Sequence, residues 1–187
     1  MWAIINKQTG IVKRILEEGS DVDEKDRNDW TALHYALSIG NAEIVRMLLK
    51  NGANVSAAAK NKDSFNSSNE ITPLMLAILT SQNFLAIKEL LDGGANTNEK
   101  DNLGNEALHY AARKRHSSKI VKLLLEAGAD PSVENLNGET PTNIALKTEG
   151  NYESATILIK ELKMKSIKEP NMEQTTSNFN FNYFCAL

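Results

Sequence analysis

Apolar residues recur at helical spacing along the first 164 residues, in short segments that come in pairs. In residues 27–60, each of the two segments places an apolar residue every three or four positions. The apolar positions of this pair are Leu33, Ala36, Leu37, Ile44, Val45, Leu48 and Leu49. Gly52 follows the second segment, at a point where glycine can end a helix without a steric clash. The pattern predicts a pair of short helices.

Two phrases in fixed order repeat this helical pair along the chain. The opening phrase, which reads Thr-Ala-Leu-His-Tyr-Ala at Thr31, recurs at residues 72, 106 and 140, in steps of 41, 34 and 34 residues. The closing phrase ends in glycine at residues 19, 52, 94 and 128, in steps of 33, 42 and 34 residues. The excess of eight residues lies between the second and third units. Recurrence at this period indicates a repeat architecture.

Both phrases resemble the ankyrin repeat, whose period is about 33 residues. The resemblance implies an all-α solenoid of about five helix-turn-helix units with short β-hairpin loops over residues 1–164. The units are expected at about residues 1–26, 27–60, 70–100, 101–134 and 135–164, with an insertion at 61–69 and a tail at 165–187. The first unit lacks the opening phrase. We expect it to serve as the N-terminal cap that a repeat array needs.

Three residues depart from the pattern of the family. Glu106 stands where the opening phrase normally has threonine, so we expect an N-cap that is weaker by about 1 kcal/mol. Asp29 stands where a turn glycine is usual, and aspartate tolerates the left-handed region better than most residues. Met75 replaces the histidine that His34 and His109 supply in other units. The resemblance implies that these histidines hydrogen-bond to neighbouring loops.

Composition argues against several classes of function. The net charge of −3 over 187 residues does not fit the strongly basic surface of nucleic-acid-binding proteins. No apolar run is long enough to span a bilayer, and the single cysteine, Cys185, allows no internal disulfide. No glycine-rich phosphate loop and no zinc-ligand spacing is present. We expect a non-enzymatic, cytoplasmic protein without cofactor or metal, which binds neither nucleic acid nor membrane.

What remains is the chemistry of a surface. By resemblance, the variable hairpin and first-helix positions would contact a partner protein in a concave groove. The apolar residues at these positions would form the centre of the groove, with arginine and lysine residues beside them. For Trp30, the alternative to contact with a partner is burial against the next hairpin. The expected contact residues are Arg27, Asn28, Trp30, Ile71, Leu79, Asn102, Leu103, Asn105, Arg113, Lys114, Asn137 and Glu139.

The insertion and the tail each allow more than one interpretation. Residues 61–69 are polar and turn-forming, and would make either a solvated finger or a recognition loop anchored by Phe65. The tail resembles the C-terminal secretion signals of bacterial effectors, which would deliver the protein into the cytosol of a host cell. It could instead fold back on the array or pair with another chain, and otherwise we expect a monomer. The expected tail anchors are Phe179, Phe181, Tyr183 and Phe184.

Overall fold

The computed structural model describes residues 1–60, 70–80 and 84–168, and in these residues it contains ten helices and two short strands. The insertion at 61–69 and the tail anchors Phe179, Phe181, Tyr183 and Phe184 lie outside the described residues. The elements are α1 (Trp2–Ile5), α2 (Thr9–Glu17), α3 (Ala32–Ser38), α4 (Ala42–Lys50), β1 (Ala59–Lys60), β2 (Glu70–Ile71), α5 (Pro73–Thr80), α6 (Phe84–Asp92), α7 (Ala107–Arg113), α8 (Ser118–Glu126), α9 (Pro141–Lys147) and α10 (Tyr152–Lys168).

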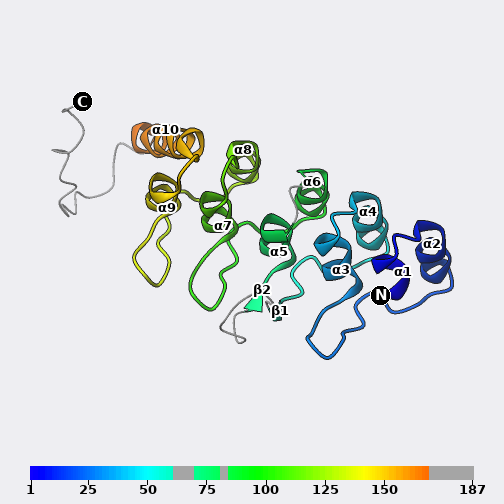
Figure 1. Cartoon of the computed structure of the whole chain (residues 1–187). Helices are drawn as coiled ribbons and strands as arrows, with labels where there is room; N and C mark the ends of the chain where they lie inside the picture. The colour runs from blue at the N-terminus through cyan, green and yellow to red at the C-terminus, as the bar shows by residue number, and fades with distance from the viewer. Residues whose placement is uncertain (61–69, 81–83, 169–187) are drawn as a thin grey trace.

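The helices form two layers that run the length of the array (Figure 1). The odd-numbered helices make an inner layer, in which α3 packs on α5, α5 on α7 and α7 on α9. The even-numbered helices make an outer layer, in which α2 packs on α4, α4 on α6 and α8 on α10. Each unit therefore contacts the units before and after it, as expected of a helical-repeat solenoid. The predicted fold class is confirmed.

The core lies between the two layers, at the apolar positions of the repeat. Leu33, Leu37, Ile44 and Leu48 are buried in the second unit, and the largest fully buried side chains of the later units are Ile71, Leu74, Met75, Ile78, Ile87, Leu90, Leu108 and Leu124. A single pair of helices could not bury these side chains, because part of their surface is covered by the helices of the adjacent units. Stacking of the units supplies the rest of the core.

Polar side chains fix where the helices begin. The Asn41 Oδ1 atom accepts a hydrogen bond from the backbone N–H of Ile44 at 3.1 Å and caps α4. The Thr140 Oγ1 atom accepts one from Asn143 at 3.2 Å, and Pro141 occupies the first helical position of α9. Both arrangements satisfy backbone donors that a helix leaves open at its N-terminus.

Loops that project from the inner layer precede α3, α5, α7 and α9, and all lie on the same side of the array (Figure 1). Before α5, β1 and β2 pair antiparallel, with Ala59 opposite Ile71 and Lys60 opposite Glu70. We call the other three loops fingers, with residues 26–30, 101–105 and 135–139. Each finger is closed by a backbone hydrogen bond from its first residue to its last, at 2.9, 3.0 and 3.1 Å.

Two local expectations can be compared with the structure directly. Asp29 adopts a positive φ of 62°, so the finger keeps the left-handed turn that a glycine usually provides. The last helix, α10, extends to Lys168, beyond the boundary expected at residue 164. It is 17 residues long, whereas the outer helices α2, α4, α6 and α8 have nine each.

Gly104→Ala is expected to lower the free energy of unfolding by about 2 kcal/mol, and Gly138→Ala by about 1 kcal/mol. Both glycines occupy the same turn of their fingers, with φ of 74° and 70°. A Cβ atom on Gly104 would lie 3.0 Å from the backbone nitrogen of Leu136, whereas one on Gly138 would meet no atom within 4 Å. Urea unfolding followed by circular dichroism measures the difference. Equal losses would show that the two fingers do not approach as closely as the structure has them.

Candidate protein-binding surface

Carboxylate and amide oxygens hold the fingers in one conformation. The Asp26 Oδ1 atom accepts hydrogen bonds from the backbone N–H groups of Asn28 and Trp30 at 2.8 and 2.9 Å. Asp101 repeats this arrangement in the next finger, at 2.8 and 2.7 Å, and Asn135 repeats it in the last, at 3.0 Å for both bonds. Such bonds to the backbone two and four residues ahead define the turn. The fingertip side chains are therefore presented on ordered backbone.

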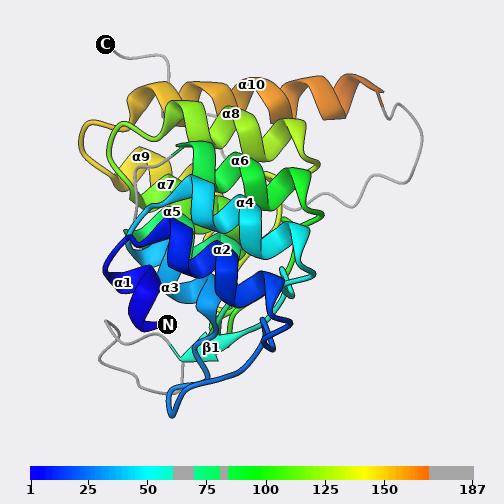
Figure 2. The same cartoon turned by 90° about the vertical axis from the view of Figure 1, so that its right-hand side faces the viewer.

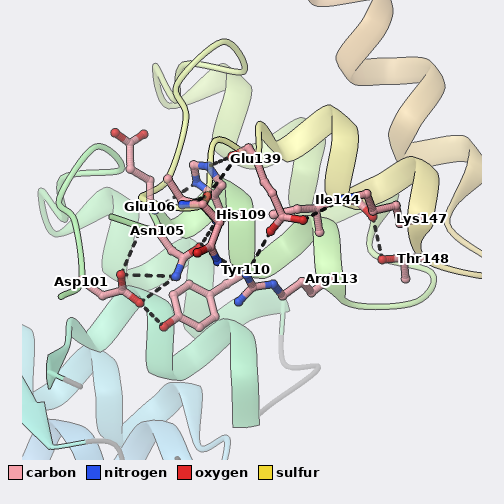
Figure 3. A network of polar contacts seen from close by, with 12 residues as sticks. Asp101, Asn105, Glu106, His109, Tyr110, Arg113, Glu139, Ile144, Lys147 and Thr148 are labelled. Atoms are coloured by element: carbon pink, nitrogen blue, oxygen red, sulfur yellow. Dashed lines mark hydrogen bonds and ion pairs between the residues drawn. The ribbon is translucent and has the colours of Figure 1, made fainter. Parts of the chain in front are cut away.

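Tyrosine side chains tie two of the fingers to the inner helices. The Tyr35 hydroxyl on α3 donates to the Oδ2 atom of Asp26 at 2.7 Å, and the Tyr110 hydroxyl on α7 donates to that of Asp101 at 2.6 Å (Figure 3). The bond to Asp26 is the main reason why the pKa of Tyr35 is raised. Each aspartate thus links its own loop to the helix that follows.

The two buried histidines have structural roles. The backbone N–H of Thr31 donates to Nδ1 of His34, and that of Glu106 donates to Nδ1 of His109, both at 3.1 Å. Because Nδ1 is the acceptor, the ring proton of His109 sits on Nε2, which donates to the backbone oxygen of Glu139 in the next finger at 3.1 Å. Burial lowers the pKa of His109, which keeps the ring neutral. The expected bond to a neighbouring loop is confirmed for His109, and His34 bonds to Thr31, the N-cap residue of its own helix.

Three of the expected contact residues are buried, and the expectation that their side chains face a partner is wrong. Trp30 packs edge-on against Tyr35 and donates from Nε1 to the backbone oxygen of Lys60 at 3.0 Å. Ile71 is buried in β2. Asn105 is buried, donates to both oxygens of Asp101 and accepts from Asn135 at 2.9 Å.

One physical reason covers all three residues. Trp30, Ile71 and Asn105 occupy the same repeat position, the last residue of the loop, and Trp30 and Asn105 each bond to the loop of the next unit. Glu139 is the fourth member of the series. It belongs to the last unit, where no further loop of the described residues covers it, and it is only half-buried. In the structure Trp30 is buried against the next hairpin, which was the alternative considered for this residue.

Most of the other expected residues lie at the surface. Lys114 is half-buried, and its Nζ atom donates to the backbone oxygen of Ile78 at 2.6 Å, near the C-terminal end of α5. Burial lowers the pKa of Lys114. This lysine therefore links two units and satisfies a helix terminus. The expected contact residues that are exposed are Arg27, Asn28, Leu79, Asn102, Leu103, Arg113 and Asn137.

A charge cluster joins the inner ends of the last two units (Figure 3). The Glu139 carboxylate lies 2.9 Å from Nζ of Lys147 and 3.9 Å from Nη2 of Arg113. The hydrogen bond from Lys147 is the main reason why the pKa of Glu139 is lowered. Two cations share one anion here, so the cluster keeps a net positive charge at neutral pH.

An open hollow of about 560 Å³ lies beside this cluster. Leu146 is exposed in this hollow, although the apolar residues at its repeat position in earlier units, Leu37, Ile78 and Ala112, are buried. For that reason Leu146 was not among the expected contact residues. Its position in the last unit is the feature that could have identified it as exposed. Leu136, at the tip of the last finger, is also exposed. The hollow is lined by Asn137, Gly138, Glu139, Asn143, Leu146 and Lys147.

Neither a metal site nor a membrane-spanning helix is found in the described part of the chain. In residues 1–60, 70–80 and 84–168, no group of three histidine, cysteine, aspartate or glutamate side chains is placed to hold a metal ion. Over the same ranges, every helix is too short or too polar to cross a bilayer.

Stacked helical hairpins with loops projecting from one layer define a helical-repeat scaffold. The sequence profile described as ankyrin repeats (three copies) matches residues 1–83, 57–135 and 81–171. The chain belongs to the ankyrin-repeat family. Members of this family are generally non-enzymatic and mediate protein–protein interaction.

Relatives come from viruses and animals. An ankyrin repeat protein of Fowlpox virus (strain NVSL) is 31% identical over 208 residues, which cover 95% of this chain and 42% of the relative. One of Acanthamoeba polyphaga mimivirus is 34% identical over 117 residues, covering 60% of this chain and 16% of the relative. The nuclear factor NF-kappa-B p105 subunit of Gallus gallus is 28% identical over 144 residues, covering 76% and 14%. The chain thus spans less than half the length of these relatives.

Proposed function

We propose that the chain binds a partner protein through a finger face, made of fingertip and inner-helix side chains on one side of the array. The observation that carries the proposal is the repeated set of hydrogen bonds that Asp26, Asp101 and Asn135 accept from the backbone. These bonds order the exposed tips of the three fingers. A preformed surface loses little conformational entropy when a partner binds. The finger face consists of Arg27, Asn28, Leu79, Asn102, Leu103, Arg113, Leu136, Asn137, Leu146 and Lys147.

The chemistry of the finger face favours a partner segment that combines apolar and acidic side chains. Four of its residues are exposed leucines, at positions 79, 103, 136 and 146. Its cations are Arg27, Arg113 and Lys147, and Glu139 is placed to offset only one of the last two. Leucine contacts would supply affinity, while complementary charge would supply specificity and a faster association.

A combined change of Arg113→Glu and Lys147→Glu is expected to weaken partner binding at least about tenfold. Peptides selected from a random display library on the wild-type chain would be titrated against the variants by calorimetry. We expect acidic and apolar residues to be enriched in them. Loss of the two cations places like charges opposite the peptide carboxylates.

The matched control is Lys119→Glu, an exposed residue of the outer helix α8. It changes the charge of the chain without touching the finger face, and binding should stay within about twofold of wild type. Circular dichroism spectra would show that all variants are folded. If the selected peptides bind the double variant as tightly as wild type, the partner surface lies elsewhere.

A further inference from the structure

Two inner helices that contribute to the finger face end close together. The turns that follow α7 and α9 lie at the same edge of the array, on the left in Figure 2, and the two helices pack on each other. Arg113 is the last residue of α7 and Lys147 the last of α9, and both occupy the same repeat position. Leu79 takes this position in α5, which packs on α7. We call Leu79, Arg113 and Lys147 the inner row.

The two cations of the inner row differ in how their charge is used. The Nζ atom of Lys147 donates to Oε1 of Glu139 at 2.9 Å, so this lysine is already paired (Figure 3). The Nη2 atom of Arg113 lies 3.9 Å from Oε2 of Glu139, which is too far for a hydrogen bond. In the described part of the chain, Arg113 donates only to Oδ1 of Asn105, at 3.4 Å. Because a guanidinium carries five N–H donors and this side chain is 44% exposed, Arg113 can still bind a carboxylate of a partner.

The backbone of Glu139 keeps its carboxylate beside Arg113. The N–H of Glu139 donates to Oδ1 of Asn135 at 3.0 Å. Its carbonyl oxygen accepts from the N–H of Asn135 and from Nε2 of His109, both at 3.1 Å. These three bonds fix the backbone, whereas the side-chain ion pairs are exposed and individually weak. A partner group that binds Arg113 therefore meets the negative charge of Glu139 next to it.

We propose that Glu139 determines which anion the finger face accepts, so that Arg113 binds one carboxylate of the partner and a doubly charged phosphate is rejected. This inference rests on the proposed function of the finger face. Two cations and one anion leave the cluster with one positive charge, which a single carboxylate neutralises. A phosphoserine side chain carries nearly two negative charges at neutral pH, and the second would lie against Glu139 without a cation to offset it. Like charges placed together in this way exclude a wrong partner.

The inner row also indicates the spacing of residues in the partner segment. Packed helices lie about 8–10 Å apart and an extended chain advances about 3.3 Å per residue, so residues three positions apart reach neighbouring units. A residue three positions from the carboxylate would therefore meet Leu79, which is exposed. On the other side of the cluster, Leu146 is exposed in the hollow. We expect the partner segment to carry one acidic residue with an apolar residue three positions away.

Calorimetry with synthetic versions of one selected peptide tests this proposal. The tightest-binding peptide from the display library would be made with glutamate or phosphoserine at the acidic position whose change to glutamine weakens binding most. The wild-type chain should bind the glutamate version at least about fivefold more tightly than the phosphoserine version. In Glu139→Gln the cluster has two positive charges. This variant should bind the glutamate version more tightly than wild type does, and the phosphoserine version should gain at least about tenfold.

The matched control is Glu134→Gln, which removes one negative charge from an exposed residue outside the cluster and should keep the affinity ratio of wild type. If Glu139 served only to hold the fold, Glu139→Gln would weaken both peptides and leave their ratio unchanged. That result refutes the proposal, as does a wild-type chain that binds the phosphoserine version as tightly as the glutamate version. If the double variant Arg113→Glu and Lys147→Glu binds the glutamate version as wild type does, the finger face itself is wrong and this inference fails with it.

Discussion

Asp101→Ala is expected to lower the free energy of unfolding by about 3 kcal/mol, the largest loss among the changes considered. The buried Asp101 carboxylate accepts from two backbone N–H groups and from the Tyr110 hydroxyl, and Asn105 also donates to it. A hydrogen bond to a charged group contributes about 1.5–3 kcal/mol, and donors left unpaired in a buried site add to the loss. Urea unfolding followed by far-ultraviolet circular dichroism measures the change.

Two further variants separate the parts of this network. Tyr110→Phe removes only the 2.6 Å bond and should lower stability by about 1 kcal/mol. Asp26→Ala removes the equivalent bonds in the first finger, where the carboxylate is only half-buried, so its effect should be smaller than that of Asp101→Ala. Asn137→Ala, at the exposed tip of the last finger, is the control and should be neutral. If Asp101→Ala is also neutral, the carboxylate does not hold the finger, and the argument for a preformed surface is lost.

Repeat spacing predicted the helices well because each helical position must satisfy the same packing requirement in every unit. Ile44, Ala86 and Ile120 differ in size, yet all are apolar and all are buried. The turn at Asp29 was also predictable, since few residues other than glycine, asparagine and aspartate tolerate its φ. These features depend on local geometry and on contacts that recur in every unit.

The binding surface was harder to predict, because spacing shows which residues are equivalent but not which way they face. Trp30 and Asn105 were placed in the groove, whereas both lie between neighbouring loops. Trp30→Ala is therefore expected to destabilise the array rather than to remove a partner contact. Leu146 is the converse case, because its repeat position is buried in the earlier units and exposed in the last one. Only the neighbouring units decide the environment of such residues.

Unit one shows the same dependence on neighbours. From the sequence alone, a shortened first unit is typical of a cap. In the structure Ile11 and Ile15 lie on the surface, whereas Leu48, at the same repeat position as Ile15, is buried between the helices of two units. The ends of a repeat array are thus where sequence and surface are least directly related.

Glu106→Thr is expected to raise the free energy of unfolding by about 1–2 kcal/mol at neutral pH. Glu106 precedes α7 and is only 2% exposed. Among the described residues, no group donates a hydrogen bond to its buried Oε2 atom. A carboxylate oxygen left unpaired in a buried site is destabilising. Threonine removes that charge, and its hydroxyl would replace the capping interaction that the Glu106 side chain makes with the backbone of His109.

The dependence of stability on pH tests the contribution of the buried Glu106 carboxylate. Burial raises the pKa of Glu106, so the folded state keeps the carboxyl proton to a higher pH than the unfolded state does. The stability of the wild type should therefore fall, relative to Glu106→Gln, as the pH rises from the unfolded value of about 4.3 through the raised folded value. Below that window the acid is neutral in both states, and the glutamine variant should match wild type.

Urea unfolding of the three proteins at several pH values between about 4 and about 7.5 provides the measurement. Glu106→Thr should be close to wild type at the lowest pH, where Glu106 is neutral, and should gain its advantage as Glu106 ionises in the wild type. Glu134→Gln, an exposed glutamate, controls for the loss of one negative charge from the chain. An advantage of Glu106→Gln that does not vary with pH would mean that the pKa of Glu106 is the same in the folded and unfolded states, so that the buried carboxylate is not destabilising. This departure from the ankyrin pattern would then not weaken the array.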